Sequence, residues 1–253
     1  MADRNSCIGV FDSGVGGMTV LRAMREQLPN ESFLYLGDTA RMPYGTKSVE
    51  TVRRYALEAA AALKARGIKL LVIACNTATA AAIEDLRRAY PDLIVIGIEP
   101  ALKPAHEMRR SGSILVLATP MTLKLEKFRA LYERYGEGAI PLPCPGLMEL
   151  VEREAFDEAE SYLRELFLPY DMHSVDAVVL GCTHYVFLRP LLAKLLPAHV
   201  LVLDGNLGTA RQLDRVLRER GLRREGGEGS VTLRTSGDEA TVIPLMQRLL
   251  RGV

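Results

Sequence analysis

Short apolar runs that alternate with longer amphipathic stretches constrain the fold of this chain more than any other feature. The apolar runs are rich in Val, Ile and Leu and lack polar alternation, which is typical of strands covered on both faces. We expect strands at Cys7–Phe11, Phe33–Gly37, Leu70–Ala74, Ile94–Ile98, Ser113–Ala118, Ala139–Leu142, Ala177–Gly181, Val200–Leu203 and Val231–Thr235. Strand and helix patterns that alternate in this way predict an α/β fold with doubly wound, mainly parallel sheets.

The stretches between these runs predict helices. The segment Ser48–Gly67 begins with a residue that can cap a helix, carries Glu50 near its start and stops at a glycine, as helices commonly do. A second long helix is expected over Thr119–Gly136. The polar connection Arg224–Ser230 is expected to be hairpin-like.

One phrase occurs twice, and each copy consists of an apolar run, a small residue, a cysteine and a short polar stretch. It reads LLVIACNTATA at 70–80 and AVVLGCTHYVF at 177–187. The repeat predicts two pseudo-symmetric α/β domains, each presenting its cysteine at the carboxyl edge of a sheet, where ligands bind in such folds. We expect residues 1–97 and 206–253 to form the first domain, because the last strand and helix can pack back onto it. Residues 98–205 would form the second domain, with the active site in a cleft between the two.

The composition argues against several classes of function. The chain has 253 residues, of which 48% are hydrophobic and 25% charged, as in ordinary soluble proteins. A formal net charge of +1 does not favour nucleic acid or an anionic membrane as a partner. No apolar run is long enough to span a bilayer and the N-terminus lacks a signal-peptide pattern, so we expect a cytoplasmic protein. The 4 cysteines form no CxxC pair, so we expect free thiols and no metal site.

Cys75 and Cys182 are the candidate reactive thiols. A single cysteine at a strand end is most simply a buried structural residue, but two cysteines in matching contexts are not explained in that way. A helix that begins after the strand would lower the pKa of the thiol through its N-terminal N–H groups. Cys7 and Cys144 lack such a context, so we expect them to be structural.

Polar side chains follow both candidate thiols. Asn76 and Thr77 follow the first cysteine, and Thr183 and His184 follow the second. These side chains suit an anion bound beside a reactive thiol. His184 is too close to Cys182 in sequence for a papain-like pair, so we interpret it as a local proton donor or polariser of the thiol.

Two further loops are expected at the carboxyl edge of the first sheet. FDSGVGG at 11–17 resembles a dinucleotide-binding loop only in part, because Thr19 stands where the last glycine of that motif is required. We therefore reject dinucleotide binding, which leaves Asp12 and Ser13 at the end of the first strand. GDTARMPYG at 37–45 carries Asp38, Arg41 and Tyr44 and is expected to form a pocket wall.

The four motifs FDSGVGG, GDTARMPYG, ACNTATA and GCTHY together resemble those of the glutamate racemases, which belong to the aspartate/glutamate racemase superfamily. The resemblance covers nearly the whole chain. It implies an isomerase that interconverts L- and D-glutamate without a cofactor or metal and supplies D-glutamate for peptidoglycan and cell-wall biogenesis. It implies glutamate as the small-molecule partner, and we expect a homodimer that binds neither nucleic acid nor membrane.

The same resemblance implies roles for individual residues. The thiol of Cys75 would remove the proton from D-glutamate and that of Cys182 the proton from L-glutamate. Asp12 and His184 would assist these thiols, and Glu152 would be a further acidic helper. The implied substrate contacts are Asp12, Ser13, Tyr44, Gly45, Asn76, Thr77, Thr119, Thr122, Thr183 and His184.

Other functions are compatible with the sequence. One alternative is an aspartate or other amino-acid racemase of the same superfamily, and another is a non-catalytic binding protein with two domains. A thiol hydrolase with a single nucleophilic cysteine would leave the second cysteine phrase unexplained.

Overall fold

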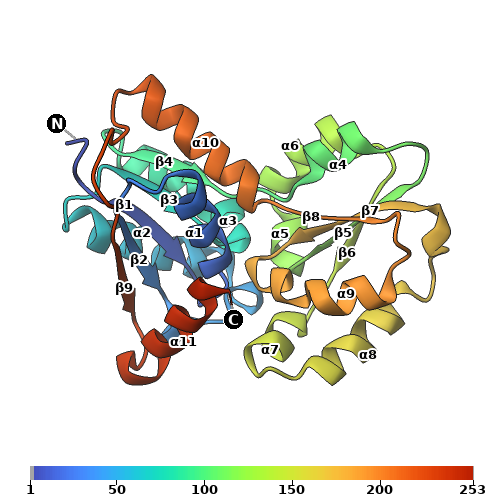
Figure 1. Ribbon diagram of the computed structural model, residues 1–253. Coiled ribbons are helices and arrows are strands. Elements are labelled where there is room, and N and C mark those ends of the chain that lie inside the picture. The colour runs from blue at the N-terminus through green and yellow to red at the C-terminus, as the bar shows by residue number, and fades with distance from the viewer. Residues whose placement is uncertain (1–2, 253) are drawn as a thin grey trace. The chain divides into compact units, whose positions relative to one another are not determined.

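The computed structural model describes residues 3–252 and divides into two compact units. The first unit extends to Ile98 and resumes at Asn206, and the second is Glu99–Gly205. The first unit is therefore discontinuous, and its first segment extends one residue beyond the boundary that we expected from the sequence. Each unit is built on its own parallel sheet (Figure 1).

The sheet of the first unit has the strand order β4-β3-β1-β2-β9, and all its neighbouring strands are parallel. Its strands are β1 (Ile8–Asp12), β2 (Phe33–Gly37), β3 (Leu70–Ile73), β4 (Ile94–Gly97) and β9 (Val231–Thr235). The last strand of the chain pairs with β2, so the C-terminal segment packs back onto the first unit, as predicted.

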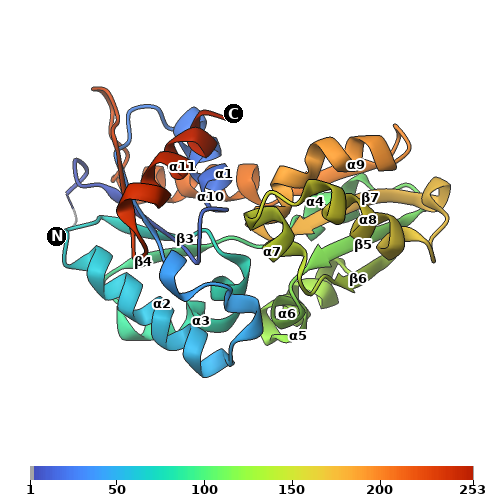
Figure 2. The same ribbon diagram turned by 90° about the horizontal axis from the view of Figure 1, so that it is seen from below.

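Helices cover both faces of this sheet. On one face lie α1 (Met18–Gln27), α10 (Asn206–Glu219) and α11 (Glu239–Arg251), where α1 contacts both of the others. On the opposite face lie α2 (Val49–Lys64) and α3 (Asn76–Ala89), which contact each other (Figure 2). The strands are apolar on both sides because both sides are covered.

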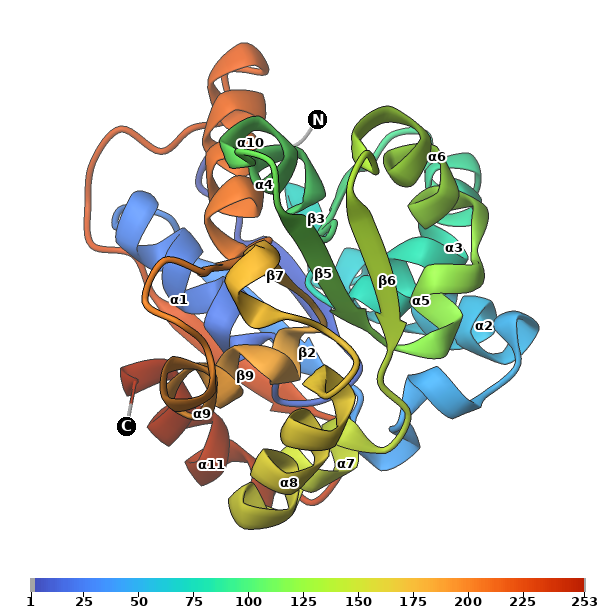
Figure 3. The ribbon, with the colours of Figure 1, turned by 90° about the vertical axis from the view of Figure 1, so that its right-hand side faces the viewer.

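The second unit has the strand order β6-β5-β7-β8, and its neighbouring strands are also parallel. Figure 3 shows β5 between β6 and β7. The strands are β5 (Ser113–Ala118), β6 (Ala139–Pro143), β7 (Val175–Gly181) and β8 (Leu201–Asp204).

The helices of the second unit also form two layers. One layer contains α4 (Leu102–Met108) and α6 (Glu126–Tyr135), which share an apolar cluster with β5 and β7. The other contains α7 (Leu147–Glu152), α8 (Phe156–Phe167) and α9 (Arg189–Leu195), which pack on the opposite side of the same strands. The short helix α5 (Pro120–Lys124) follows β5 directly.

The two sheets repeat one topology. The order β2-β1-β3-β4 in the first unit corresponds to β6-β5-β7-β8 in the second, and β9 is an additional strand beside β2. The strand that corresponds to β2 is β6, which forms a sheet edge and contains Pro141 and Pro143. Proline removes a ladder donor and is confined to such edges. The sequence repeat therefore reflects a repeated fold in which each cysteine phrase begins on the third strand.

Most predicted elements are present with ends shifted by one or two residues. The helix predicted from Ser48 is α2, and the Ser48 hydroxyl accepts the N–H of Thr51 at 3.2 Å as its N-terminal cap. Gly67, where that helix was predicted to stop, has φ of +75°, a left-handed conformation that glycine adopts at little cost.

Two predictions are wrong. The expected continuous helix over Thr119–Gly136 is two helices, α5 and α6, because Leu125 is extended with φ −84° and ψ 153°. The break separates α5, which contacts β6, from α6, which packs on α4. The connection at 224–230 is not hairpin-like, because it leads from helix α10 to a parallel strand.

Among the residues that the structure describes, no helix combines the length and the apolar character needed to cross a membrane.

A buried ion pair stabilises the amino-terminal side of the first sheet. The Nζ of Lys69 lies 2.6 Å from Oε2 of Glu31, and the two side chains are 0% and 2% exposed. The same Nζ donates to the carbonyl oxygens of Arg4 at 2.6 Å and Leu222 at 2.9 Å. Glu31 also accepts the backbone N–H of Arg224 at 2.8 Å. The pair thereby ties two distant segments, at Arg4 and at 222–224, to the core.

Replacing Glu31 by Gln should lower the free energy of unfolding by about 3 kcal/mol, because the Lys69 ammonium loses the carboxylate that compensates its burial. The matched control Glu84→Gln removes an exposed ion pair with Arg87 and should change stability by about 0.5 kcal/mol or less. Chemical denaturation followed by circular dichroism measures both. An equally small loss in both variants would contradict the structural role of the buried pair.

Candidate functional site

The first group of candidate residues lies at the reversal point of the first sheet. This is the position between β1 and β3, because the chain adds β2 on one side of β1 and then β3 on the other. Strands β1 and β3 are neighbours, but the helix after β1 packs on one face of the sheet and the helix after β3 on the other. The loops after the two strands therefore diverge, and open α/β sheets bind ligands at this position. Asp12 ends β1 and Ser13 follows it, and Cys75 follows β3.

Cys75 is the N-terminal cap of helix α3. Its Sγ accepts the backbone N–H of Ala78 at 3.4 Å and lies 3.3 Å from the hydroxyl oxygen of Ser13. The residue is only 5% exposed. A helix N-terminus and a hydroxyl neighbour both stabilise the thiolate form of a cysteine, so this thiol is placed to exchange a proton.

Asp12, the last residue of β1, is fully buried. Its Oδ2 accepts the backbone N–H of Gly14 at 2.8 Å. A Cβ at Gly17 would lie 2.7 Å from the Cβ of Asp12 and 2.7 Å from the Tyr35 hydroxyl. The glycine-rich loop is thus required for close packing around Asp12.

Asn76 and Thr77 are the first two residues of α3, and each is 4% exposed. Within residues 3–252 the buried Oδ1 of Asn76 has no hydrogen-bond partner. A buried polar atom without a partner is costly, and a bound ligand with a donor group would satisfy it.

The loop after β2 contributes Tyr44 and Gly45, which lie in a single 3₁₀ turn at Tyr44–Thr46. The Tyr44 side chain is buried, and its hydroxyl donates to Oδ2 of Asp38 at 2.5 Å. Burial raises the pKa of Tyr44, and the hydrogen bond to Asp38 raises it further, so the phenol is a permanent donor. Because that donor is already used, a ligand at this loop would meet its backbone.

The second group of candidate residues lies at the corresponding position of the second sheet, after β5 and β7. Strand β5 leads to α5, and its neighbour β7 leads to a 3₁₀ helix at Thr183–Leu188 that packs with the opposite layer. Thr119 caps α5, and its hydroxyl lies 2.9 Å from that of Thr122. Cys182 follows β7 and is 8% exposed, and Thr183 is 3% exposed.

Cys182 has a different neighbour from Cys75. Its side chain caps no helix, and its Sγ lies 3.9 Å from Nδ1 of His184. The other ring nitrogen, Nε2 of His184, hydrogen-bonds to Oε1 of Glu152 at the end of α7. Cys182, His184 and Glu152 therefore form a chain of proton-carrying groups within the second unit.

The charge state of His184 follows from this chain. Burial lowers the pKa of an imidazole, but the hydrogen bonds and charges of Cys182 and Glu152 outweigh it and raise the pKa of His184 well above 6.5. In the imidazolium form both ring nitrogens donate, one to the sulfur and one to the carboxylate. His184 can then stabilise a thiolate at Cys182.

Cys144 lies in the same unit but has the character of a structural residue. It is 2% exposed, and its thiol donates to the carbonyl of Leu142 at 3.3 Å. Burial raises its pKa to about 12. A thiol with so high a pKa is a poor proton acceptor at neutral pH, in agreement with the structural role predicted for it.

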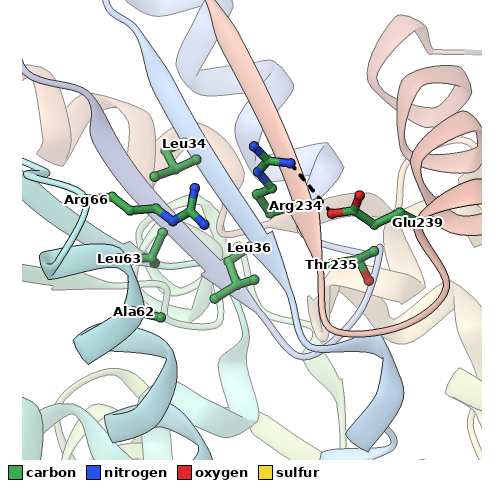
Figure 4. A pocket seen from close by; sticks show the side chains of 8 residues that line it. All are labelled: Leu34, Leu36, Ala62, Leu63, Arg66, Arg234, Thr235 and Glu239. Atoms are coloured by element: carbon green, nitrogen blue, oxygen red, sulfur yellow. Dashed lines mark ion pairs between the residues drawn. The ribbon is translucent and has the colours of Figure 1, made fainter.

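Within residues 3–252, no three His, Cys, Asp or Glu side chains gather in a group that could hold a metal ion. A cavity of about 280 Å³ opens on the first unit between α2 and β9 (Figure 4). Its lining consists of four aliphatic side chains, Arg66, Thr235 and the ion pair of Arg234 with Glu239, at 3.7 Å. None of the candidate residues lines it.

Sequence reasoning missed two contacts. The hydrogen bond between Ser13 and Cys75 joins residues 62 positions apart. The second joins Asp38 to Ser236, at a separation of 198 positions. The only sequence signal for either contact is that each residue follows a predicted strand by one or two positions.

Three comparisons with known proteins agree that this chain is similar to racemases. A family model described as Asp/Glu/Hydantoin racemase matches residues 8–213. A glutamate racemase of Clostridium botulinum (strain Alaska E43 / Type E3) is 43% identical over 99% of both chains. The crystal structure of glutamate racemase from Thermus thermophilus in complex with β-chloro-D-alanine is 39% identical, with a TM-score of 0.84 over 98% of this chain and 94% of that one. The glutamate racemase from Francisella tularensis subsp. tularensis SCHU S4 in complex with D-glutamate is 26% identical, with a TM-score of 0.85 over 98% and 94%.

Replacing Glu152 by Gln should lower the pKa of His184, because the carboxylate that stabilises the imidazolium is lost. NMR titration of histidine-labelled protein measures this pKa, with His184→Asn identifying the resonance. Because folding raises this pKa, its contribution to stability is present below the ordinary value of 6.5 and is lost as the pH rises through the raised value. The stability deficit of Glu152→Gln should therefore be largest at low pH.

The control is Glu149→Gln, which removes a carboxylate from the same helix and should leave the His184 titration unchanged. An unaltered His184 pKa in Glu152→Gln would show that the carboxylate does not hold the imidazolium.

Proposed function

We propose that this chain, which belongs to the Asp/Glu/hydantoin racemase family and is therefore an isomerase, interconverts L- and D-glutamate without a cofactor. The observation that carries the proposal is that each unit places a buried cysteine with a proton-exchanging neighbour at the reversal point of its sheet. Inversion at carbon requires one group that removes a proton and another that delivers one to the opposite face. Two thiols supply both groups.

In the proposed mechanism the two thiols exchange roles with the direction of the reaction. Cys75 as thiolate removes the α-proton of D-glutamate while Cys182 as thiol delivers a proton to the other face. For L-glutamate, Cys182 is the base and Cys75 the acid. After each turnover the two cysteines hold the protonation states required for the reverse direction.

The two thiols are activated by different means. The N-terminus of α3 and the Ser13 hydroxyl stabilise the thiolate of Cys75. The His184 imidazolium does the same for Cys182 and is itself held by Glu152. Asp12, which is buried at the end of the strand that neighbours β3, is proposed to accept the substrate ammonium group and to assist proton exchange at Cys75.

Further residues are proposed to bind the two carboxylates of glutamate. The polar start of α3 at Asn76 and Thr77 and the loop at Thr183 present donors of the kind that bind anions. The backbone at Tyr44 and Gly45 and the hydroxyls of Thr119 and Thr122 are proposed as additional contacts.

Proton transfer by positioned thiols explains part of the required rate. General acid–base catalysis contributes about 10²–10⁴-fold, whereas the α-hydrogen of an amino acid is a very weak acid. The rest is proposed to come from donors fixed around the developing carbanion and from exclusion of water.

Glutamate is proposed as the substrate because the relatives carry its name and one of them was crystallised with D-glutamate. The product D-glutamate would then serve peptidoglycan synthesis in the cytoplasm. The homodimer expected from the sequence stays a prediction. Faster turnover of aspartate than of glutamate would favour the alternative assignment within the same family.

Replacing Cys75 or Cys182 by Ser should reduce racemisation of either enantiomer by at least about 10³-fold, because a hydroxyl is a far weaker acid–base group at neutral pH than a thiol. Circular dichroism of L- and D-glutamate measures the loss. Each single variant retains one base and should still eliminate chloride from a β-chloro amino acid of the matching configuration.

Cys7→Ser is the control, since Cys7 is a free, partly exposed thiol, and it should keep full activity. Solvent deuterium that enters Cα of glutamate in the wild type distinguishes a racemase from a binding protein. Full activity of Cys182→Ser would refute the scheme with two bases.

A further inference from the structure

The loop that carries Tyr44 and Gly45 is organised around one buried carboxylate. Asp38 is 1% exposed and accepts the Tyr44 hydroxyl at 2.5 Å. The Nε of Arg41 lies 2.9 Å from its Oδ1 and 2.7 Å from its Oδ2. The two side chains come from the two 3₁₀ turns of the loop, so Asp38 fixes the relative position of those turns.

The two donors of the loop keep their protons. Burial raises the pKa of Tyr44, as described above. Burial opposes the charge of Arg41, but hydrogen bonds to Asp38 and Glu58 outweigh it and raise the pKa of that guanidinium. The geometry of the loop therefore depends on how well Asp38 is held.

A further donor reaches Asp38 from the C-terminal segment. The hydroxyl of Ser236, which follows β9, donates to Oδ1 of Asp38 at 2.6 Å. The same hydroxyl oxygen accepts the backbone N–H of Ala40 at 3.1 Å. One side chain thus bridges the buried carboxylate and the backbone of the loop.

Neighbouring contacts strengthen the junction that Ser236 forms with Asp38 and Ala40. The hydroxyls of Thr235 and Thr39 lie 2.6 Å apart, and the backbone N–H of Ser236 donates to the carbonyl of Gly37 at 3.0 Å. The junction stands at the carboxyl ends of β2 and β9, which pair in parallel up to Gly37 and Thr235. It is therefore at the same edge of the sheet as Asp12 and Cys75.

We propose that Ser236 is a positioning residue for the racemisation: its hydroxyl holds Asp38 and the Ala40 backbone so that the loop presents Tyr44 and Gly45 to the substrate. The inference rests on the proposed function, since it assigns the loop to substrate binding. Ser236 acts through Asp38 and does not itself touch the substrate. The additional strand of the first unit, which has no counterpart in the second, thereby has a function in the reaction.

Replacing Ser236 by Ala should raise KM for both glutamate enantiomers on the order of tenfold, as expected for one lost hydrogen bond to a charged group, with kcat reduced less than KM is raised. Ser236→Thr keeps a hydroxyl at an exposed position and should restore KM. Hydrogen exchange of the peptide over residues 38–46, read by mass spectrometry, should be faster in Ser236→Ala.

The matched control is Ser230→Ala at the other end of β9. It removes a hydroxyl that bonds the Ser32 hydroxyl at 3.1 Å, at the sheet edge opposite to the candidate residues. It should leave KM and the exchange of residues 38–46 unchanged, whatever it does to overall stability.

The outcomes distinguish failure of the positioning role from failure of the proposed function. If the wild type racemises glutamate but Ser236→Ala matches Ser230→Ala in KM and loop exchange, the positioning role is wrong and the proposed function stands. A failure of Ser236→Thr to restore KM would also overturn the positioning role. If the wild type does not racemise glutamate, the proposed function is wrong, and the role of Ser236 in the reaction is rejected with it.

Discussion

Parallel pairing of the strands is the constraint on which the candidate site depends. It brings the carboxyl ends of all strands in a unit to one edge. The segments that follow β1 and β3 pack on opposite faces of the first sheet, and those that follow β5 and β7 on opposite faces of the second, so the loops after these strands diverge at that edge. Each sheet consequently places a cysteine at the point where these loops diverge, directly before the helix or 3₁₀ helix that follows the strand.

Within this common plan the two units place different chemical groups around the sulfur atoms of Cys75 and Cys182. Cys75 receives a backbone N–H and a serine hydroxyl, which are neutral groups of fixed position. Cys182 receives an imidazole that is linked to a carboxylate, which can carry a mobile proton. The fold repeats more faithfully than the side chains do, because strand order depends on burial of apolar faces, whereas the neighbours of a thiol depend on single residues.

The sequence predicted those features that burial and local capping determine. Unbroken Val, Ile and Leu runs located the strands, Ser48 located the start of α2, and the run before Cys75 placed this residue at a helix N-terminus. The break at Leu125 was missed because apolar periodicity continues through one extended residue. The contact of Ser236 with Asp38 was missed because it joins residues 198 positions apart, and their positions after two predicted strands do not show that those strands are neighbours. The roles of the candidate residues stay predictions.

The additional strand β9 also affects how the chain behaves in solution. Without it, β2, whose sequence is FLYLG, would be the open border of the first sheet. Such an apolar border recruits strands from other molecules. β9 replaces it with VTLRT, where Thr232 and Arg234 are exposed, and the second unit protects the equivalent border with two prolines. The C-terminal strand is therefore a safeguard against fibre formation, and a chain released before residue 231 would be the form most prone to aggregate.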